Sequence, residues 1–354
     1  MKILSIDTSC DETTAAVTEG TKVLSNVIWS QASMHAKFGG IYPSLAKRAH
    51  EERIDWVINK ALVGIDAVAV TLGPGLAIAL EVGIKAAKKL AKEYKKPLIA
   101  VNHVEGHVLS VLAEPKNLKT EKLKNKKLIT SHQSLIFPVL SLIASGGTTQ
   151  LILVEEIGKY KIIAQTSDDA LGEALDKAAR MLGLGYPGGA VLEKISKDGD
   201  PNFYPLPIPM IGQEDKLKFS YSGLKTAFYK LVEKEKPLTK EKIQNLAASY
   251  QNVAFQHVER MIKKVVEIYP VNEFWFGGGV SANIELRRRI RSICRKGGIA
   301  LYLPYSKKLC TDNAAMIGVA AYFKFGRKRF LNPNDLDKVE RVPRAKVDKR
   351  FPWE

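Results

Sequence analysis

The sequence predicts an α/β protein of two related lobes that close on a nucleotide, and three turns carry this prediction. Strand-like patterns at residues 2–6 and 15–17 flank a polar turn, and the same pattern at 138–144 and 151–154 flanks a second one. A third turn, with glycines at 277–279, follows an apolar strand and precedes a helix. Glycines there let the backbone approach an anionic or flat ligand closely. This order of turns favours duplicated mixed sheets flanked by helices.

The first turn, residues 7–14, combines carboxylates with hydroxyls and backbone N–H groups. The hydroxyls and N–H groups can meet phosphate oxygens, while the carboxylates of Asp11 and Glu12 lie near a cation. An ordinary β-hairpin with a polar tip explains the same residues. The turn alone therefore does not decide between a ligand site and a plain hairpin.

Between residues 38 and 94 the pattern predicts two helices separated by a buried strand at 67–71. Ser44 is the expected cap of the first helix. Its apolar face runs through Leu45, Ile54, Val57, Ile58 and Leu62. The glycine–proline–glycine turn at 73–75 leads into a helix over 77–94. It either aims the start of that helix at the cleft or serves as a tight strand-to-helix connection.

A pair of histidines follows a short apolar run at 97–101, which is typical of a buried parallel strand. His103 and His107 are four residues apart at the start of a predicted helix, so they share one face and can hold one metal ion. The spacing alone is a weak signal, because such pairs occur by chance on solvated helix faces. A third ligand from elsewhere in the chain would strengthen it.

The second half of the chain contains several predicted helices. Residues 240–269 carry apolar residues at helical spacing, so a long core-facing helix is expected, with His257 structural rather than a ligand. Further helices are predicted at 284–295 and 313–325. Residues 219–226 are expected to form a loop entering a helix, in which Lys225 reaches an anion or caps the helix.

The chain of 354 residues has a formal net charge of +17, which points to a polyanionic partner or to a lysine-rich proteome. Its three cysteines have no metal-site spacing and indicate a reducing compartment. The N-terminal residues form a strand rather than a signal peptide, and no apolar run is long enough to span a bilayer. We therefore expect a cytoplasmic protein without a membrane partner.

Nine motifs together give a specific resemblance over residues 2–325. They are, in order, SIDTSCDETTAAV, GGIYPSLAKRAH, TLGPGL, NHVEGH, ASGGTTQLILV, DKAARMLGLGYPGG, FSYSGLKTA, GGGVSAN and CTDNAAMIG. This set resembles the universal tRNA threonylcarbamoyladenosine synthase family, bacterial TsaD type, once described as O-sialoglycoprotein endopeptidases. The three turns likewise resemble the actin-like ATPase and sugar-kinase superfamily, whose two lobes clamp a nucleotide.

The resemblance implies a site, residue by residue. His103, His107 and Asp312 match the metal ligands of the family, and two imidazoles with a carboxylate suit one divalent ion, Fe²⁺ or Zn²⁺. The substrate-binding residues that match are Ile143, Ala144, Ser145, Gly146, Gly147, Asp176, Gly189, Glu193 and Asn283. Of these, 143–147 embrace the phosphate and carbamoyl region, Asp176 meets the ribose hydroxyls and Asn283 lies beside the adenine.

Three features depart from the family pattern. Ile143 stands where the archaeal branch has a metal-reaching tyrosine, and Ser44 stands where bacterial members usually have glutamate. The segment 113–135 is longer than the bacterial norm and carries six lysines, either as a mobile loop or as an arm that contacts RNA. The implied domains are a first lobe at 1–112 completed by a helix at 311–326, this insertion, a second lobe at 136–310 and a basic tail at 327–354, which contacts RNA or stays disordered.

The implied activity is transfer of the threonylcarbamoyl group from threonylcarbamoyl-AMP to N6 of adenosine 37 in tRNAs that read ANN codons, with release of AMP. The metal would polarise the carbonyl or bind phosphate oxygens, and Asp11, Glu12 or water would take the amine proton. The implied partners are tRNA, a TsaB-like paralogue and a TsaE-like P-loop ATPase.

Three alternatives remain. A small-molecule kinase or ATPase of the same fold explains the turns but leaves the histidines unused. A zinc endopeptidase would need glutamate directly after the first histidine, whereas here Glu105 is two residues after His103. A non-catalytic scaffold would have no reason to keep the complete ligand set.

Overall fold

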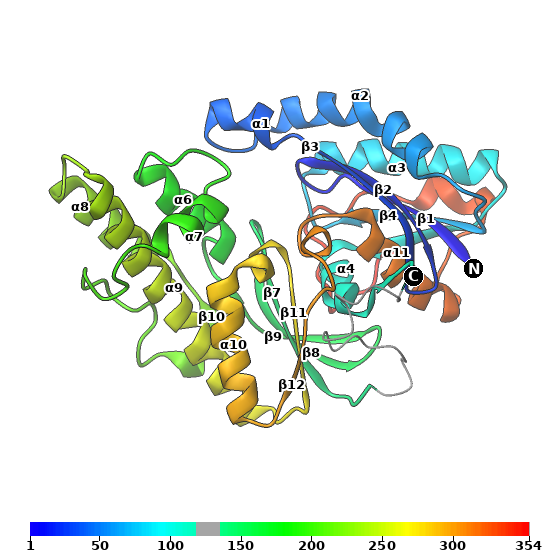
Figure 1. Cartoon of the computed structure of the whole chain (residues 1–354). Coiled ribbons are helices and arrows are strands. Elements are labelled where there is room, and N and C mark those ends of the chain that lie inside the picture. Colours follow the sequence, from blue (N-terminus) through cyan, green and yellow to red (C-terminus); the bar gives the residue numbers. More distant parts are fainter. Residues whose placement is uncertain (118–134, 354) are drawn as a thin grey trace.

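The computed structural model describes residues 1–117 and 135–353 and contains two six-stranded sheets (Figure 1). The first sheet has the order β5-β4-β1-β2-β3-β6. Its strands are β1 (Lys2–Asp7), β2 (Glu12–Glu19), β3 (Lys22–Ser30), β4 (Ala67–Gly73), β5 (Leu98–Asn102) and β6 (Glu114–Pro115). Strands β1, β4 and β5 are parallel, and β2 is antiparallel to both β1 and β3. The carboxyl ends of β1, β4 and β5 therefore meet at one edge of this sheet.

The second sheet has the order β10-β9-β8-β7-β11-β12 and repeats the hairpin of the first. Its strands are β7 (Val139–Ala144), β8 (Thr149–Glu156), β9 (Lys159–Thr166), β10 (Lys218–Phe219), β11 (Glu273–Gly277) and β12 (Ala300–Tyr302). As in the first sheet, an antiparallel hairpin (β7–β8) lies beside a parallel neighbour (β11). The prediction of duplicated mixed sheets flanked by helices is confirmed.

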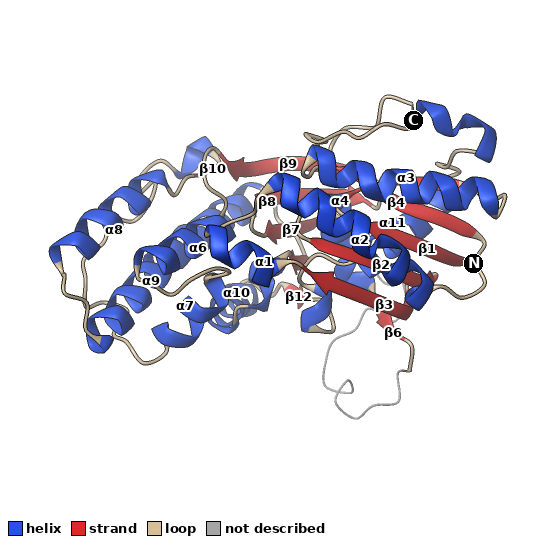
Figure 2. Ribbon diagram, turned by 90° about the horizontal axis from the view of Figure 1, so that it is seen from above, coloured by secondary structure: helices blue, strands red, loops and turns tan. Residues whose placement is uncertain are grey.

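Helices cover both faces of the sheets in layers (Figure 2). The first-lobe helices are α1 (Ala32–His35), α2 (Pro43–Ala61), α3 (Ala77–Glu93), α4 (His103–Leu109) and α11 (Ala314–Gly326). The second-lobe helices are α6 (Leu171–Met181), α7 (Gly189–Ser196), α8 (Ser222–Lys234), α9 (Lys240–Ile268) and α10 (Ile284–Lys296). Alternate residues of β1 face opposite layers: Leu4 packs toward α2 and α3, whereas Ile3 packs toward α4 and α11.

The core around α4 and α11 is shared by the two lobes. Val139, Ile152 and Trp275 of the second sheet lie in the same buried cluster as Ile317 of α11 and Val104 of α4. The other face of the second sheet packs against α6 through α10. Helices α4 and α11 therefore lie between the two sheets, which is where Figure 1 places them.

Two local predictions were wrong and one segment is more ordered than expected. Helix α2 begins at Pro43, with Tyr42 as the residue before it, so Ser44 is not its cap; proline fits the first helical position because it lacks an N–H. Helix α8 begins at Ser222, inside the stretch expected to be a loop. The tail folds onto the first lobe, where Leu336 and Val339 are buried and Leu331 pairs with Leu98.

The lysine-rich insertion lies mostly outside the described residues, since 118–134 are not among them. Of its six lysines, only Lys116 falls in the described part of the chain. Its two alternative roles and the division of the chain into domains stay predictions. No helix among the described residues is both long and apolar enough to cross a membrane.

Candidate metal centre and nucleotide cleft

Two capped helices bring the predicted metal ligands together. Asn102 ends β5, and its side chain accepts hydrogen bonds from Val104 N (2.9 Å) and Glu105 N (3.3 Å), so α4 starts at His103. Asn313 likewise accepts from Met316 N (3.1 Å) at the start of α11. Each cap is the immediate neighbour of a ligand, which fixes where that ligand leaves the backbone.

The three side chains converge at distances that suit one ion. His107 Nε2 lies 3.2 Å and His103 Nε2 lies 3.5 Å from Asp312 Oδ1, and one ligand atom of each residue lies within 4.8 Å of the others. Metal–ligand bonds of about 2.0–2.2 Å at tetrahedral angles put neighbouring ligand atoms roughly 3.3–3.6 Å apart. The donor set and its spacing therefore fit a divalent ion. Among the described residues this is the single group of three or more such side chains.

Glycines allow the layers around α4 to come this close. A Cβ on Gly106 would lie 2.8 Å from Ile317 Cδ1 of α11, and a Cβ on Gly277 would lie 2.5 Å from the His107 carbonyl. Both contacts are too short for real side chains. At Gly106 the end of the Ile317 side chain would have to move, whereas at Gly277 the clash is with backbone and a larger residue would push the layers apart. Gly106 thus lets α11, the helix that follows Asp312, approach α4 closely. Gly277 likewise lets the third turn approach the backbone carbonyl of His107.

Asp7 is a functional residue that the sequence reasoning missed. It ends β1, it is buried, and its Oδ2 lies 3.4 Å from His103 Nδ1; Ser9 Oγ lies 3.1 Å from the same nitrogen. A carboxylate on Nδ1 holds the proton there and leaves Nε2 as the ligand atom. Strand order could have revealed this contact. Strands β5 and β1 flank β4 and run parallel to it, so their carboxyl ends, which carry His103 and Asp7, lie at one edge of the sheet.

The pKa values of the two histidines in the cluster shift in opposite directions. Burial opposes a charge on His103, but the carboxylates of Asp312 and Asp7 outweigh burial and raise the pKa of His103 well above its ordinary value. Burial lowers the pKa of His107. Although burial alone would raise the pKa of Asp312, the two histidines hold it well below its ordinary value. Asp312 is therefore ionised, as a metal ligand must be.

Glu105 turns away from this cluster, which argues against the endopeptidase. Its Oε1 accepts a hydrogen bond from Tyr160 Oη (3.1 Å) and lies 3.6 Å from Arg327 Nη2. A peptidase glutamate must reach the metal-bound water. Here the carboxylate instead ties α4 to β9 of the second lobe and to the end of α11.

The first turn places Asp11 and Glu12 close enough to Asp312 for the three carboxylates to affect one another. Burial raises the pKa of Glu12, and Asp11 and Asp312 add to the effect. Ser30 Oγ donates a hydrogen bond to Glu12 Oε1 (3.2 Å). The charge of Asp11 also raises the pKa of Asp176, although burial is the larger cause there. Asp11 of the first lobe therefore lies near enough to Asp176 of the second for its charge to act on it.

The second turn, residues 145–148, has no charged side chain, so a ligand would meet mainly its backbone. Ser145 N donates to Thr148 O (2.8 Å), Thr148 N donates to Ser145 Oγ (3.1 Å), and Gly172 N donates to Ser145 O (3.1 Å). Positions 146 and 147 are exposed, and a Cβ on either glycine would meet nothing within 4 Å. Ile143 and Ala144 are fully buried at the end of β7, so neither side chain can reach a ligand.

The remaining predicted residues lie around the starts of α7 and α10 in the second lobe. Asp176 Oδ1 accepts hydrogen bonds from Gly188 N (2.9 Å) and Gly189 N (2.7 Å), which orders the start of α7. Glu193 Oε1 accepts from Ile284 N (2.8 Å) at the start of α10. Asp176 and Glu193 are therefore engaged in ordering α7 and α10.

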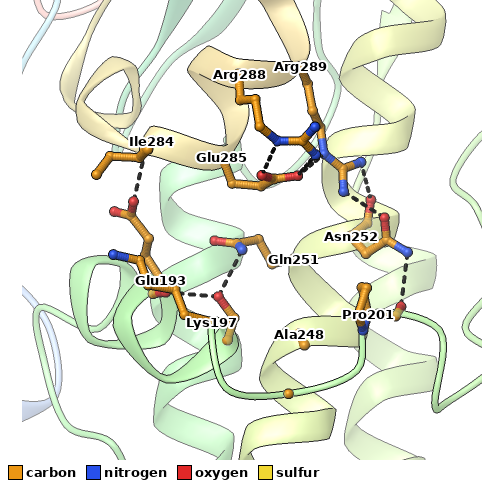
Figure 3. Close-up of a pocket in the computed structure, with 12 residues that line it drawn as sticks. Glu193, Lys197, Pro201, Ala248, Gln251, Asn252, Ile284, Glu285, Arg288 and Arg289 are labelled. Atoms are coloured by element: carbon orange, nitrogen blue, oxygen red, sulfur yellow. Dashed lines mark hydrogen bonds and ion pairs between the residues drawn. The ribbon is translucent and has the colours of Figure 1, made fainter.

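A pocket of about 420 Å³ opens between α7, α9 and α10 (Figure 3). Its lining includes Glu193, Lys197, Gln251, Ile284 and Arg288. Asn283 lies beside it: its Nδ2 donates to Gln251 Oε1 (3.0 Å), while its Oδ1 caps α10 by accepting from Leu286 N (2.9 Å). Gln251 was not predicted, because a polar residue inside a long helix has no local signature. His257 has a structural place, since burial lowers its pKa to about 4 and it packs against Phe219.

Solved structures share this arrangement. HypF in a phosphate- and nucleotide-bound form superposes with a TM-score of 0.55 at 16% identity, covering 91% of this chain and 54% of that one. The (R)-2-hydroxyglutaryl-CoA dehydratase component A of Acidaminococcus fermentans gives a TM-score of 0.51 at 14% identity, covering 92% of this chain and 99% of that one. These likenesses show the fold alone. With the duplicated sheets and paired turns, they place the chain in the actin-like ATPase and sugar-kinase fold class.

Sequence comparison narrows the class to one family. A family model described as tRNA N6-adenosine threonylcarbamoyltransferase matches residues 22–319. A protein of that name from Thermodesulfovibrio yellowstonii is 43% identical over 336 residues, covering 92% of this chain and 95% of the relative. Another from Clostridium novyi is 40% identical over 360 residues, covering 99% of both chains. The chain belongs to the tRNA N6-adenosine threonylcarbamoyltransferase family, and it is a transferase that modifies tRNA.

Proposed function

We propose that this chain transfers the threonylcarbamoyl group of threonylcarbamoyl-AMP to N6 of adenosine 37 in tRNAs that read ANN codons. The observation that carries the proposal is the contact of one glycine turn with both halves of the site. Gly277 packs against the His107 carbonyl, and the next residue, Gly278, packs against the Ala144 carbonyl at the end of β7. The candidate metal ligands and the open phosphate-binding turn are therefore joined through two consecutive residues.

Threonylcarbamoyl-AMP is a mixed anhydride and is already reactive. The site therefore mainly has to position the two substrates and stabilise the charge that develops during transfer. The adenosine N6 attacks the carbamoyl carbon, the bond from that carbon to the phosphate oxygen breaks, and AMP leaves. Backbone N–H groups of Gly146 and Gly147 hold the leaving phosphate. The pocket beside Asn283 takes the adenine of the leaving AMP. The pair Asp11 and Glu12 accepts the N6 proton, for which the raised pKa of Glu12 is suited.

A divalent ion, Fe²⁺ or Zn²⁺, is the cofactor that the donor set fits, held by His103, His107 and Asp312. When bound, it supplies a Lewis acid for an oxygen of the substrate. The chain contributes the orientation of the ligands: Asp7 holds His103, and the two asparagine caps fix α4 and α11. By family resemblance we propose a cytoplasmic setting, with a TsaB-like paralogue and a TsaE-like P-loop ATPase as partners.

The test combines metal content with transfer activity. Purified chain, together with the proposed partner proteins, is incubated with threonylcarbamoyl-AMP and an ANN-reading tRNA, and modified nucleosides are measured by mass spectrometry. We expect modification by the wild type and a loss of about a hundredfold or more in Asp312→Asn, which also loses bound metal. Asp337→Asn is the matched control, because that carboxylate is exposed on the tail. Full transfer by a His103→Ala, His107→Ala double variant would refute the role of the metal.

A further inference from the structure

An exposed aromatic pair lies on the segment that joins α1 to α2. The rings of Phe38 and Tyr42 stack with centroids 5.4 Å apart and planes 21° apart. Phe38 is 60% exposed and Tyr42 is 52% exposed. Large aromatic side chains are usually buried in a core or at an interface, so two stacked rings left in solvent suggest a surface that receives another flat group.

This pair lies on a segment that contacts the second lobe. Gly39, next to Phe38, accepts a hydrogen bond from Arg180 Nη1 of α6 (2.9 Å), so the segment touches the second lobe. Helix α6 also carries Asp176, and Figure 1 shows α1 on the side of the first lobe that faces α6. The segment thus bridges the two lobes beside α6.

The segment is also held to the first turn. Tyr42 N donates to His35 Nδ1 (3.3 Å), His35 Nε2 lies 3.1 Å from Gln31 Oε1, and Gln31 N donates to Asp11 O (2.9 Å). A chain of contacts therefore fixes the backbone of Tyr42 relative to the turn that carries Asp11. A segment whose backbone is held this way loses less conformational entropy when its side chains bind a ligand.

The positive charge near the aromatic pair favours a nucleic acid as the molecule that binds there. Lys37 and Arg180, both exposed, flank the pair, and the whole chain carries a formal net charge of +17. Proteins that recognise single-stranded loops stack unpaired bases on aromatic side chains and draw the backbone to nearby cations. A base that reacts inside a pocket must leave its stack, which exposes the faces of its neighbours.

We propose that Phe38 and Tyr42 form a stacking platform for the unpaired bases that flank the reacting adenosine in the anticodon loop. This inference rests on the proposed function, which supplies the adenosine. The platform takes a neighbouring base while the target base enters the cleft. The polar contacts of the segment hold its backbone beside α6, and Lys37 and Arg180 attract the phosphates between those bases.

The test replaces the rings and keeps their apolar character. Phe38→Leu, Tyr42→Leu should bind an anticodon stem-loop at moderate salt about tenfold or more weakly than the wild type and raise the KM for tRNA, with AMP affinity unchanged. Phe38→Trp should retain the affinity. Tyr229→Leu is the control, because that ring is 53% exposed on α8. A stem-loop lacking the base at position 36 or 38 should weaken wild-type binding and leave the double variant unaffected.

The outcomes separate the two hypotheses. If the wild type makes no modified nucleoside, the proposed function fails. If the wild type modifies tRNA and the double variant has the wild-type KM and stem-loop affinity, the platform is refuted while the function stands. Unchanged stem-loop affinity together with weakened binding of either partner protein would identify the pair as a protein-docking surface, and it would also refute the platform.

Discussion

The two hairpin turns occupy equivalent places in the two sheets but have opposite chemistry. The β1–β2 turn is acidic and mostly buried, and its Asp7 reaches the side chain of His103. The β7–β8 turn has no charged residue, and its two glycines are exposed with open space around them. The same hairpin thus supports the candidate metal ligands in the first lobe, and in the second lobe it leaves two open glycines where we propose that the phosphate binds.

The two turns also differ in how they are held. Thr8 Oγ1 donates to Ala79 O (2.8 Å), and Leu76 N donates to Ser9 O (2.8 Å), so the first turn is fixed by side-chain and backbone contacts with the 73–76 connection and α3. The second turn is fixed mainly through backbone, by Gly172 N and by its own internal bonds. Rigid side chains suit a metal ligand set, whereas free N–H groups suit an anion that enters and leaves.

The largest expected effect tests the acidic turn. Asp7→Asn removes the charge beside His103 Nδ1, so the imidazole is less firmly held in the tautomer that offers Nε2. We expect the affinity for Zn²⁺ to fall about 10- to 100-fold, as measured by calorimetric titration. Asp11→Asn, in the same turn, serves as the control and should bind Zn²⁺ like the wild type. Equal affinities in both variants and the wild type would show that Asp7 does not support the ligand set.

The comparison also shows what the sequence could predict. Both turns and the strands that directly flank them have local patterns, so their positions were predicted correctly. Helix α6, which follows the second hairpin, was not predicted. The contact between Asp7 and His103 was not predicted either, because it depends on the order of the strands in the sheet. The tail was missed for a similar reason: Leu336, Val339 and Phe351 are buried, but they are scattered among charged residues and have no periodic pattern.

The second expected effect tests the glycine turn. Gly147→Ala adds a methyl group that meets no protein atom, so we expect the thermal stability to stay unchanged. The methyl group would occupy space proposed for the phosphate, and we expect AMP affinity to fall about tenfold, or about 1.4 kcal/mol. Gly64→Ala is the matched control, since its methyl group is equally free of contacts. If both variants bind AMP as the wild type does, the phosphate does not sit at this turn.

The smallest expected effect concerns pH, to which only the first turn should respond. His50 is buried, its Nδ1 lies 2.8 Å from Thr13 Oγ1, and its Nε2 lies 3.0 Å from Cys10 O at the tip of the turn. This arrangement suits neutral imidazole, which donates from Nε2 and accepts at Nδ1. Burial lowers the pKa of His50 below its ordinary value, while Cys10 O and the nearby aspartates partly oppose the shift.

Because its folded pKa lies below the unfolded value of about 6.5, the unfolded chain takes up the proton first as the pH falls. The contribution of His50 to the free energy of unfolding is thus complete above that pH and declines below it, by at most about 1.4 kcal/mol per pH unit. His50→Gln can keep one donor and one acceptor without titrating. Urea unfolding between pH 7.5 and 5.5 should therefore show a shallower pH dependence in this variant than in the wild type. Identical slopes would mean that protonation of His50 does not affect the free energy of unfolding. The two turns would then differ only in the ligands that they are proposed to bind.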